Sequence, residues 1–176
     1  LGELLCPARI SAETTEQLRR LSSAIYSAQY QQDPFPEEGR MFQREKFKIV
    51  TAVPGDVIAW VRFWDMAGTA GGTGARTASV RMGRTTNGRY VIVNVVKGRW
   101  NEHGVNETVV QVATLEGKTL PIREEQEPGS SGLAVIAARA RLLAGYDYAG
   151  IRSTGDKVLR AQPFRSQVDA GNVDIV

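Results

Sequence analysis

Residues 57–64 have the sequence VIAWVRFW, in which all but one side chain is apolar, and the carboxylate Asp65 follows directly. Because the run is apolar at both odd and even positions, it predicts a central β-strand that is covered on both faces. An acid at the tip of such a strand is held rigidly at the rim of a sheet, where a metal ion or a substrate can approach. The glycine-rich residues 68–74 predict a loop beside it. The alternative is that Asp65 only forms a turn or caps a helix.

A second acidic strand end follows later in the chain. Residues 122–127 have the sequence IREEQE, and residues 128–132, PGSSG, predict a turn and the start of a helix. Side chains alternate between the two faces of a strand, so Glu125 and Glu127 share one face and Glu124 lies on the other. We expect Glu124 to face away from the site or to be solvated. Two acidic strand ends are less easily explained as turn formers than one is. We expect the two ends to lie together at one site.

The rest of the pattern alternates between strands and helices in the manner of α/β proteins. Asn87 and Gly88 are the signal of a tight hairpin, so the strands on either side of them should be antiparallel neighbours. Hairpins, a crossover helix and further strands predict a mixed sheet flanked by helices. Strands are expected at residues 57–65, 76–83, 90–97, 120–126 and 147–152, and helices at residues 104–116, 131–144 and 156–170.

Two of the predicted helices carry apolar residues at helical spacing. The inward face of the helix at 104–116 is predicted to hold Val105, Val109, Val112 and Ala113. The inward face of the helix at 131–144 is predicted to hold Leu133, Ile136, Ala137, Ala140 and Leu143. In the last helical stretch, Pro163 predicts a kink or a restart.

The first part of the chain has a different character. Ser11 is a plausible cap for a helix that runs to about Tyr30. The polar, proline-containing residues 31–39 then predict a linker, and we place a domain boundary near residues 40–50. A helix and a linker cannot form a domain alone, so this part either belongs to another domain or packs on the one that follows.

Composition narrows the chemistry of any metal site. The 176 residues include one Cys and one His, so no cluster of thiolates or imidazoles can form within the chain. A metal would be held by carboxylates, which points to magnesium or manganese. The net charge of +3 permits binding of a polyanion without establishing it. No apolar run approaches the roughly 20 residues of a membrane span, and the start at Leu1 indicates a fragment or a processed product.

Several segments, taken in order, resemble the nuclease domain of phage large terminase subunits, the motor proteins of DNA packaging. The resemblance covers nearly the whole chain, and it implies an RNase H-like fold, divalent metal and endonucleolytic cutting of concatemeric viral DNA. Its segments are residues 30–34 (YQQDP), 36–39 (PEEG), 63–67 (FWDMA), 83–84 (GR), 125–132 (EQEPGSSG), 154–163 (TGDKVLRAQP) and 171–173 (GNV).

The resemblance implies roles for the acids. Asp65 and Glu125 would be ligands of a two-metal Mg²⁺ or Mn²⁺ site, with Glu127 assisting, and Glu125 matches the family's strand acid better than Glu127 does. The family takes a third acid from an Asp pair after the last strand, a segment expected beyond Val176, so this chain is expected to be catalytically incomplete. The late acids, at positions 169 and 174, are interpreted as a helix-face charge and a strand residue.

The basic residues are interpreted against the same family. Lys157 and Arg160 match its basic pair and would contact DNA phosphates. The alternative is that they only form a solvent-exposed face of a helix. Arg76 and Arg84 are further candidates for DNA contact, together with Arg81 and Arg89, although arginine in strands often only protects an edge. In residues 70–77 (AGGTGART), alanine stands at both positions where a P-loop requires glycine, and arginine stands in place of its lysine. No ATP site is therefore expected.

The resemblance also implies the setting. Residues 1–48 would be the helix and linker at the end of a terminase ATPase domain, and residues 49–176 the nuclease domain. Partners would be double-stranded DNA, the ATPase domain, the small terminase subunit and the portal, in the cytoplasm of the bacterial host.

Two other functions stay open. The chain could be a non-catalytic module that docks DNA or the portal, because its third acid is missing. It could also be another RNase H-like nuclease, such as a resolvase or transposase core, which would prefer branched DNA or specific ends.

Overall fold

The computed structural model of the chain describes residues 11, 14, 41–67 and 75–176. Two compact units divide the chain, residues 1–42 and 43–176. In the first unit the backbone N–H of Thr14 donates to Ser11 Oγ at 3.1 Å, the contact expected of a helix cap. The remainder of the predicted helix, the linker at residues 31–39 and the glycine-rich loop at residues 68–74 lie outside the described residues.

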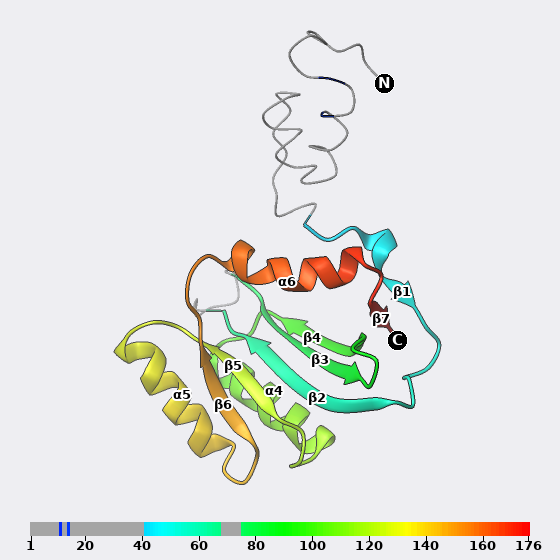
Figure 1. The fold of residues 1–176 in the computed structure, drawn as a ribbon. Coiled ribbons are helices and arrows are strands. Elements are labelled where there is room, and N and C mark those ends of the chain that lie inside the picture. The colour runs from blue at the N-terminus through cyan, green and yellow to red at the C-terminus, as the bar shows by residue number, and fades with distance from the viewer. Residues whose placement is uncertain (1–10, 12–13, 15–40, 68–74) are drawn as a thin grey trace. The chain divides into compact units, whose positions relative to one another are not determined.

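In the described part of the second unit, seven strands form one mixed sheet in the order β1-β7-β4-β3-β2-β5-β6 (Figure 1). β2, β3 and β4 are antiparallel, and every other neighbouring pair is parallel. This confirms the predicted α/β mixed sheet. The strands are β1 (Lys48–Ile49), β2 (Val57–Asp65), β3 (Thr77–Thr85), β4 (Tyr90–Gly98), β5 (Ile122–Gln126), β6 (Tyr148–Arg152) and β7 (Val173–Ile175).

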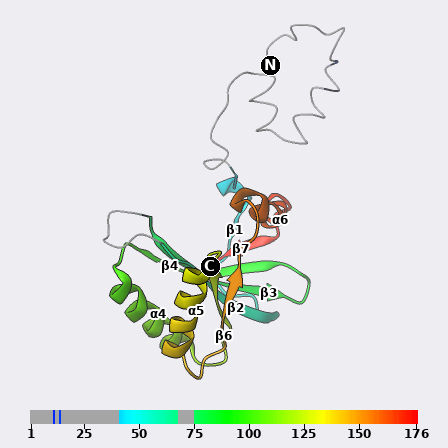
Figure 2. The same ribbon diagram turned by 90° about the vertical axis from the view of Figure 1, so that its left-hand side faces the viewer.

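Three α-helices of this described part flank the sheet: α4 (Glu102–Glu116), α5 (Ser130–Leu142) and α6 (Lys157–Asp169). α4 and α5 lie on one face, and α6 lies on the other (Figure 2). A short 3₁₀ helix, η1 (Arg44–Lys46), precedes β1. No helix among the described residues is long and apolar enough to cross a membrane.

The predicted hairpin joins β3 to β4. The backbone N–H of Thr85 donates to Arg89 O at 2.9 Å, and Gly88 has a φ of 81°. Glycine adopts this left-handed conformation without the steric penalty that a side chain imposes, which is why the Asn-Gly pair marks the turn. The hairpin fixes the register of β3 against β4 and, through β3, against β2.

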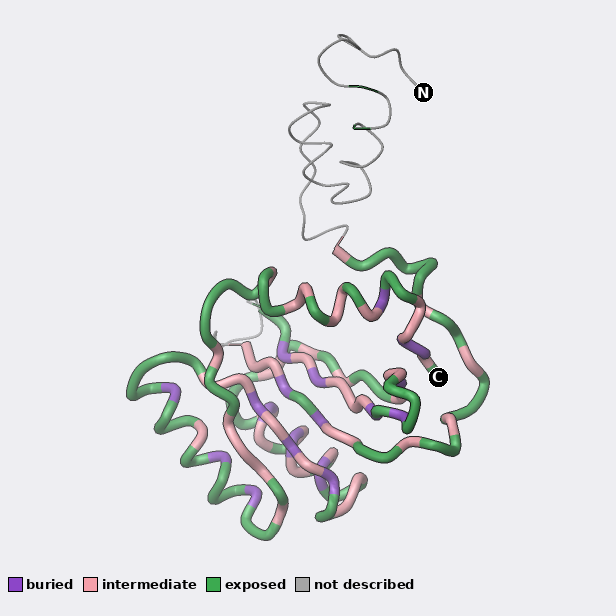
Figure 3. The backbone as a smooth tube through the Cα atoms, in the orientation of Figure 1, coloured by how far each residue is buried: buried purple, intermediate pink, exposed green. Residues whose placement is uncertain are grey.

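The core lies between the central strands and α4 (Figure 3). Trp64 of β2 is 1% exposed and packs in one cluster with the α4 residues Val105, Val109 and Ala113. The inward face predicted for this helix is therefore confirmed. Asn101 caps the helix by accepting a hydrogen bond from the backbone N–H of Gly104 at 2.9 Å.

The inward face predicted for α5 is only partly correct. Leu143 is 1% exposed and belongs to the core cluster, and Ile136 is half-buried. Leu133, however, is 59% exposed, and Ala137 and Ala140 are exposed too, whereas Gly132 and Arg139 are buried. A Cβ added to Gly132 would lie 2.1 Å from the backbone O of Glu127, so only glycine allows this approach. The close contact at the start of α5 and an ion pair from Arg139 to the sheet therefore act together with Ile136 and Leu143 to set the rotation of the helix.

α6 runs unbroken through Pro163, so the predicted restart does not occur. Asp156 caps it by accepting hydrogen bonds from the backbone N–H groups of Val158 and Leu159. Farther along the helix, Val168 is fully buried, and Phe164 meets Tyr90 of β4 edge to face. The cap and these contacts fix where the first turn of α6 lies against the sheet.

Candidate active site

The two acidic strand tips lie side by side. β2 and β5 are parallel neighbours, and their register pairs Trp64 with Glu124. The strands β2 and β5 end at the same rim of the sheet (Figure 1). The next residue of each strand is Asp65 and Glu125, so both acids lie at this rim. Their side chains share one face, because residues paired across neighbouring strands point the same way.

A single ammonium group contacts both carboxylates. Lys157, the first residue of α6, places its Nζ 2.7 Å from Asp65 Oδ2 and 4.0 Å from Glu125 Oε2. One helical turn later, Arg160 donates to Glu125 Oε1 at 2.9 Å. The two acids are therefore close enough to contact one cation. From the sequence, Lys157 and Arg160 are expected either to contact DNA phosphates or to be exposed to solvent. Nothing in the sequence indicates that they contact these two acids.

Glu125 keeps its negative charge although part of its side chain is withdrawn from water. Burial by itself raises the pKa of a carboxyl group, because it penalises the charged form. Hydrogen bonds from Arg160 and Ser153, with the positive charges of Arg160 and Lys157, outweigh burial and leave the pKa of Glu125 below its usual value. At neutral pH this side chain is an anionic oxygen donor, which a hard divalent cation requires.

The ion pair between Asp65 and Lys157 is loosely held. The Asp65 side chain is 47% exposed and that of Lys157 is 68% exposed. Exposed pairs of this kind contribute at most about 1 kcal/mol, because water screens the attraction and both side chains lose freedom. Either partner can therefore exchange the other for a ligand at little cost.

The acids open into a pocket of about 560 Å³. Glu127, the third predicted acid, lines the same pocket, and so does Arg76. The first turns of α4 and α5 also line it, with Glu102 and Ser131. The pocket therefore joins the rim of the sheet to the starts of two helices and brings together all three predicted catalytic acids.

Asp65 and Glu125 fit the oxygen coordination that magnesium and manganese favour. Among the residues that the structure describes, no group of three or more His, Cys, Asp or Glu side chains is arranged to hold a metal ion. The donor set therefore fits a divalent cation held by two carboxylates. Water and substrate phosphate commonly fill the remaining positions around magnesium.

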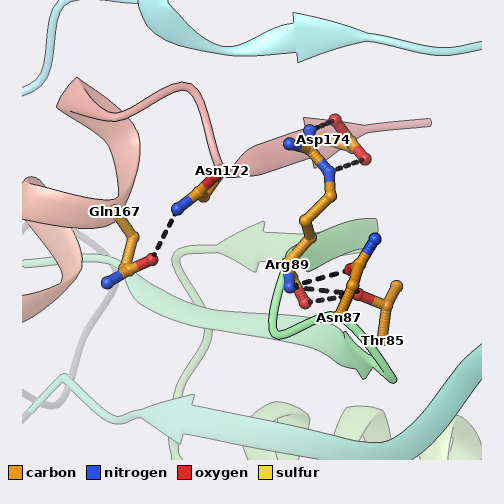
Figure 4. Close-up of polar contacts among 6 residues, drawn as sticks. All are labelled: Thr85, Asn87, Arg89, Gln167, Asn172 and Asp174. Atoms are coloured by element: carbon orange, nitrogen blue, oxygen red, sulfur yellow. Dashed lines mark hydrogen bonds and ion pairs between the residues drawn. The ribbon is translucent and has the colours of Figure 1, made fainter.

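The two late acids take the structural roles expected from the sequence. Asp169 ends α6 and pairs with Arg165 at 3.6 Å. Asp174 is buried in β7, where the Arg89 side chain contacts both of its carboxylate oxygens (Figure 4). Neither acid is among the described residues that line the pocket.

The arginines of the hairpin strands separate into two groups. Arg81 lies 3.9 Å from Glu116 of α4, and Arg89 pairs with Asp174, so both are held within the fold. Arg76 and Arg84 are exposed, but they lie at opposite ends of β3. Of these four arginines, only Arg76 lies at the rim that carries the acids.

Glu124 points to the opposite face of the sheet from Asp65 and Glu125, as expected, but it is buried and not solvated, and it also lines the pocket. Its side chain is 1% exposed, accepts from Arg139 Nε at 3.2 Å and accepts from Tyr148 Oη at 2.8 Å. Burial, and then the neighbouring carboxylate, raise the pKa of Tyr148, so this hydroxyl stays a donor. Strand alternation gives the direction of Glu124, but no sequence signal identifies Arg139 as its partner.

Arg62, the one charged side chain in residues 57–64, is also buried. It donates to Glu116 Oε2 at 3.0 Å, to Asn94 Oδ1 at 2.8 Å and to Ser79 Oγ at 3.3 Å. A charge within an apolar strand is a signal that could have been used, because a buried charge requires a partner. The sequence does not say which acid that partner is.

Solved structures that are similar to this chain include viral terminase nucleases. The large terminase nuclease domain from bacteriophage SPP1, with bound Mn, is 14% identical with a TM-score of 0.55, and the match covers 76% of this chain and 72% of that one. The human cytomegalovirus terminase nuclease domain is 14% identical over 80% and 74%, with a TM-score of 0.49. The large terminase nuclease from thermophilic phage G20c, with bound magnesium, is 11% identical over 74% and 70%, with a TM-score of 0.43.

The fold is similar to that of the SPP1 large terminase nuclease domain. This confirms the RNase H-like class expected from the sequence. No protein-family model and no curated protein matches the sequence. The likeness to the SPP1 terminase domain thus supplies the fold, and the roles of the side chains rest on their own geometry.

Proposed function

We propose that this chain is the nuclease domain of a viral large terminase and that it cuts concatemeric double-stranded DNA during genome packaging. The main support for the proposal is that Asp65 and Glu125 lie together at the rim of the sheet, where the ammonium group of Lys157 contacts both carboxylates. The fold shared with the SPP1 terminase domain supports the choice of reaction. In this proposal residues 1–48 belong to the end of the ATPase domain, and the small terminase subunit and the portal are partners.

Asp65 and Glu125 would hold Mg²⁺ or Mn²⁺. A divalent ion at such a site supplies positive charge to the phosphodiester and makes water acidic enough to attack phosphorus. Glu125 enters the reaction ionised, because its pKa lies below the usual value. Two ions require more oxygen donors than two carboxylates provide, and Glu127, which lines the same pocket, is the proposed assisting acid.

Lys157 and Arg160 would change partners when DNA arrives. They now contact Asp65 and Glu125, and the Lys157 side chain is largely exposed. Charge-assisted hydrogen bonds to phosphate are strong, so these groups can move from the acids to the backbone of the bound strand. The proposal therefore gives the two basic residues the work of orienting the phosphate beside the acids.

The test is cleavage of supercoiled plasmid by Asp65→Asn, which keeps the shape of the side chain and removes its charge. We expect nicking in Mg²⁺ or Mn²⁺ to fall by at least about 100-fold, equivalent to about 2.7 kcal/mol of transition-state stabilisation. The matched control is Asp169→Asn, an equally conservative change at an exposed acid that does not line the pocket. Cleavage that survives in Asp65→Asn and disappears in Asp169→Asn would move the active site elsewhere.

A non-catalytic docking module is the second candidate. It is favoured by one observation, that no third acid completes a metal-binding group among the described residues. A docking module would bind DNA without any metal-dependent cutting. Wild-type protein that leaves plasmid intact over a range of Mg²⁺ and Mn²⁺ concentrations, while still retarding it in a gel, would favour this candidate.

A further inference from the structure

Three exposed cations gather where β3 begins and β4 ends. Arg76 directly precedes β3, Lys97 lies near the end of β4, and Arg99 follows β4. None of the three has an ion-pair partner among the described residues. We call these residues the rim cluster. Like charges gathered without a counterion repel one another, so their position calls for an external anion.

The strand register places the rim cluster beside the acids. Asp65 is paired with Ala78 of β3, and Ala78 is paired with Lys97 of β4. Directly opposed residues of antiparallel strands have side chains on the same face, so Lys97 and Asp65 point to the same side of the sheet. Neighbouring strands lie about 4.8 Å apart, so their Cα atoms are separated by roughly 10 Å. In the strand register, the residue between them is the small Ala78.

The end of β4 is held firmly in this position. A Cβ added to Gly98 would lie 2.2 Å from the Trp100 ring, so the indole packs directly against the glycine backbone. Trp100 also packs against the core cluster that contains Trp64. Arg99 lies between these two anchored residues and is exposed. The cluster is therefore built on fixed backbone, and its side chains are directed to solvent.

We propose that the rim cluster binds the phosphate backbone of DNA on one side of the bond that is cut. This inference rests on the proposed function, because it takes Asp65 and Glu125 as the place of cutting. Phosphates of one strand advance by about 3.4 Å per nucleotide along the duplex axis, so roughly 10 Å corresponds to about three nucleotides. DNA then crosses the strand ends from β4 toward β5, with the rim cluster on one side of Asp65 and α6 on the other.

The test measures binding of a short fluorescein-labelled duplex to the full chain by anisotropy, in EDTA and at several salt concentrations. Each lost phosphate contact flattens the plot of log affinity against log salt by about one unit. We therefore expect Lys97→Ala to lower the slope by about one, and the triple Arg76→Ala, Lys97→Ala, Arg99→Ala variant to lower it by about three. The matched control is Arg141→Ala, an exposed arginine on α5 with no ion-pair partner among the described residues.

The outcomes separate this inference from the proposed function. Rim variants that bind with the wild-type slope overturn the inference even if wild-type protein cuts plasmid. An equal loss in Arg141→Ala also overturns it, because the effect would then follow from net charge alone. If the rim variants lose affinity and the control does not, but no preparation cuts DNA in Mg²⁺ or Mn²⁺, the cluster stands and the proposed nuclease activity fails.

A second measurement on wild-type protein avoids any effect of substitution on folding. Acetylation of lysines by a soluble reagent, read by mass spectrometry, reports which amino groups a ligand covers. DNA should protect Lys97 and leave Lys118, which lies over the Tyr146 ring and away from β4, as reactive as before. Equal reactivity of Lys97 with and without DNA would overturn the inference.

Discussion

The two faces of the sheet hold their charges in opposite ways. On the face under α4 and α5, Arg62 and Glu124 are each 1% exposed and fully partnered by side chains from the helices and neighbouring strands. At the rim beside α6, Asp65 and Lys157 are 47% and 68% exposed and have one close partner in each other. Buried groups that lose a partner suffer the full cost of desolvation, whereas exposed groups turn to water.

This difference separates folding from function within one sheet. The buried pairs connect β2 and β5 to α4 and α5, so they fix where the strand ends lie. In the proposed function, the exposed acids at those strand ends exchange Lys157 for a metal ion or a substrate. The first group should therefore respond to mutation through stability, and the second through binding and activity.

The largest loss of stability should come from Arg62→Ala, which removes the buried ion pair and hydrogen bonds of this side chain. Glu116, which is 10% exposed, would lose its closest cation, and Asn94 and Ser79 would lose a donor. Removing one member of a buried ion pair typically costs about 3–5 kcal/mol. Urea unfolding followed by circular dichroism measures this cost. A change below 1 kcal/mol, as expected for the exposed control Arg141→Ala, would mean that the network does not anchor α4.

The second-largest effect should be an increase in the free energy of unfolding when a metal ion binds the exposed acids at the rim. A ligand that binds only the folded state at 100 times its dissociation constant adds about 2.7 kcal/mol to the free energy of unfolding. We expect Mn²⁺ to raise the melting temperature of wild-type protein and to leave that of Asp65→Asn unchanged. Calcium is the control, because it is also a hard divalent cation that binds oxygen ligands. It shows whether the stabilisation depends on the size and geometry of the ion or only on its charge. An equal Mn²⁺ effect in both proteins would place the metal away from Asp65.

The sharpest form of the comparison uses two adjacent residues of β5. Glu124→Gln leaves Arg139 buried without a negative partner, and we expect a loss of about 1–3 kcal/mol in unfolding free energy. Glu125→Gln changes a more exposed group, and we expect less than about 1 kcal/mol. Plasmid cleavage should show the reverse order, with the larger loss in Glu125→Gln. If both variants lost stability equally, the division between the two faces would not hold.

Local patterns in the sequence predict much of the fold. The apolar run before Asp65, the Asn-Gly turn and the alternation of Glu124 and Glu125 each depend on neighbours in the chain. They suffice to place two acids at the tips of strands. The parallel pairing of β2 with β5 brings these tips together, as expected.

Contacts between distant residues could not be predicted in the same way. The rotation of α5 depends on Arg139 reaching Glu124 and on the approach of Gly132 to the Glu127 carbonyl. Most positions of that helix are apolar, so the spacing alone did not separate the exposed Leu133 from the buried Leu143. The position of Lys157 beside Asp65 likewise depends on where α6 packs, and a one-residue change in its start would remove the contact.

The smallest effect should come from Lys157→Ala. The ion pair with Asp65 is exposed, so we expect the free energy of unfolding to change by less than about 1 kcal/mol. The same change removes a positive charge that DNA would contact, so the dependence of binding on salt should flatten by about one unit of log affinity per log salt. Stability is read from urea unfolding, and binding from the anisotropy of the fluorescein-labelled duplex at several salt concentrations. Leu159→Ala, a change of similar size on an exposed, uncharged side chain of the same helix, controls for the loss of side-chain volume. A large loss of stability in Lys157→Ala would show that the ion pair holds α6 in place, and the exposed rim would then be part of the scaffold and not a surface reserved for ligands.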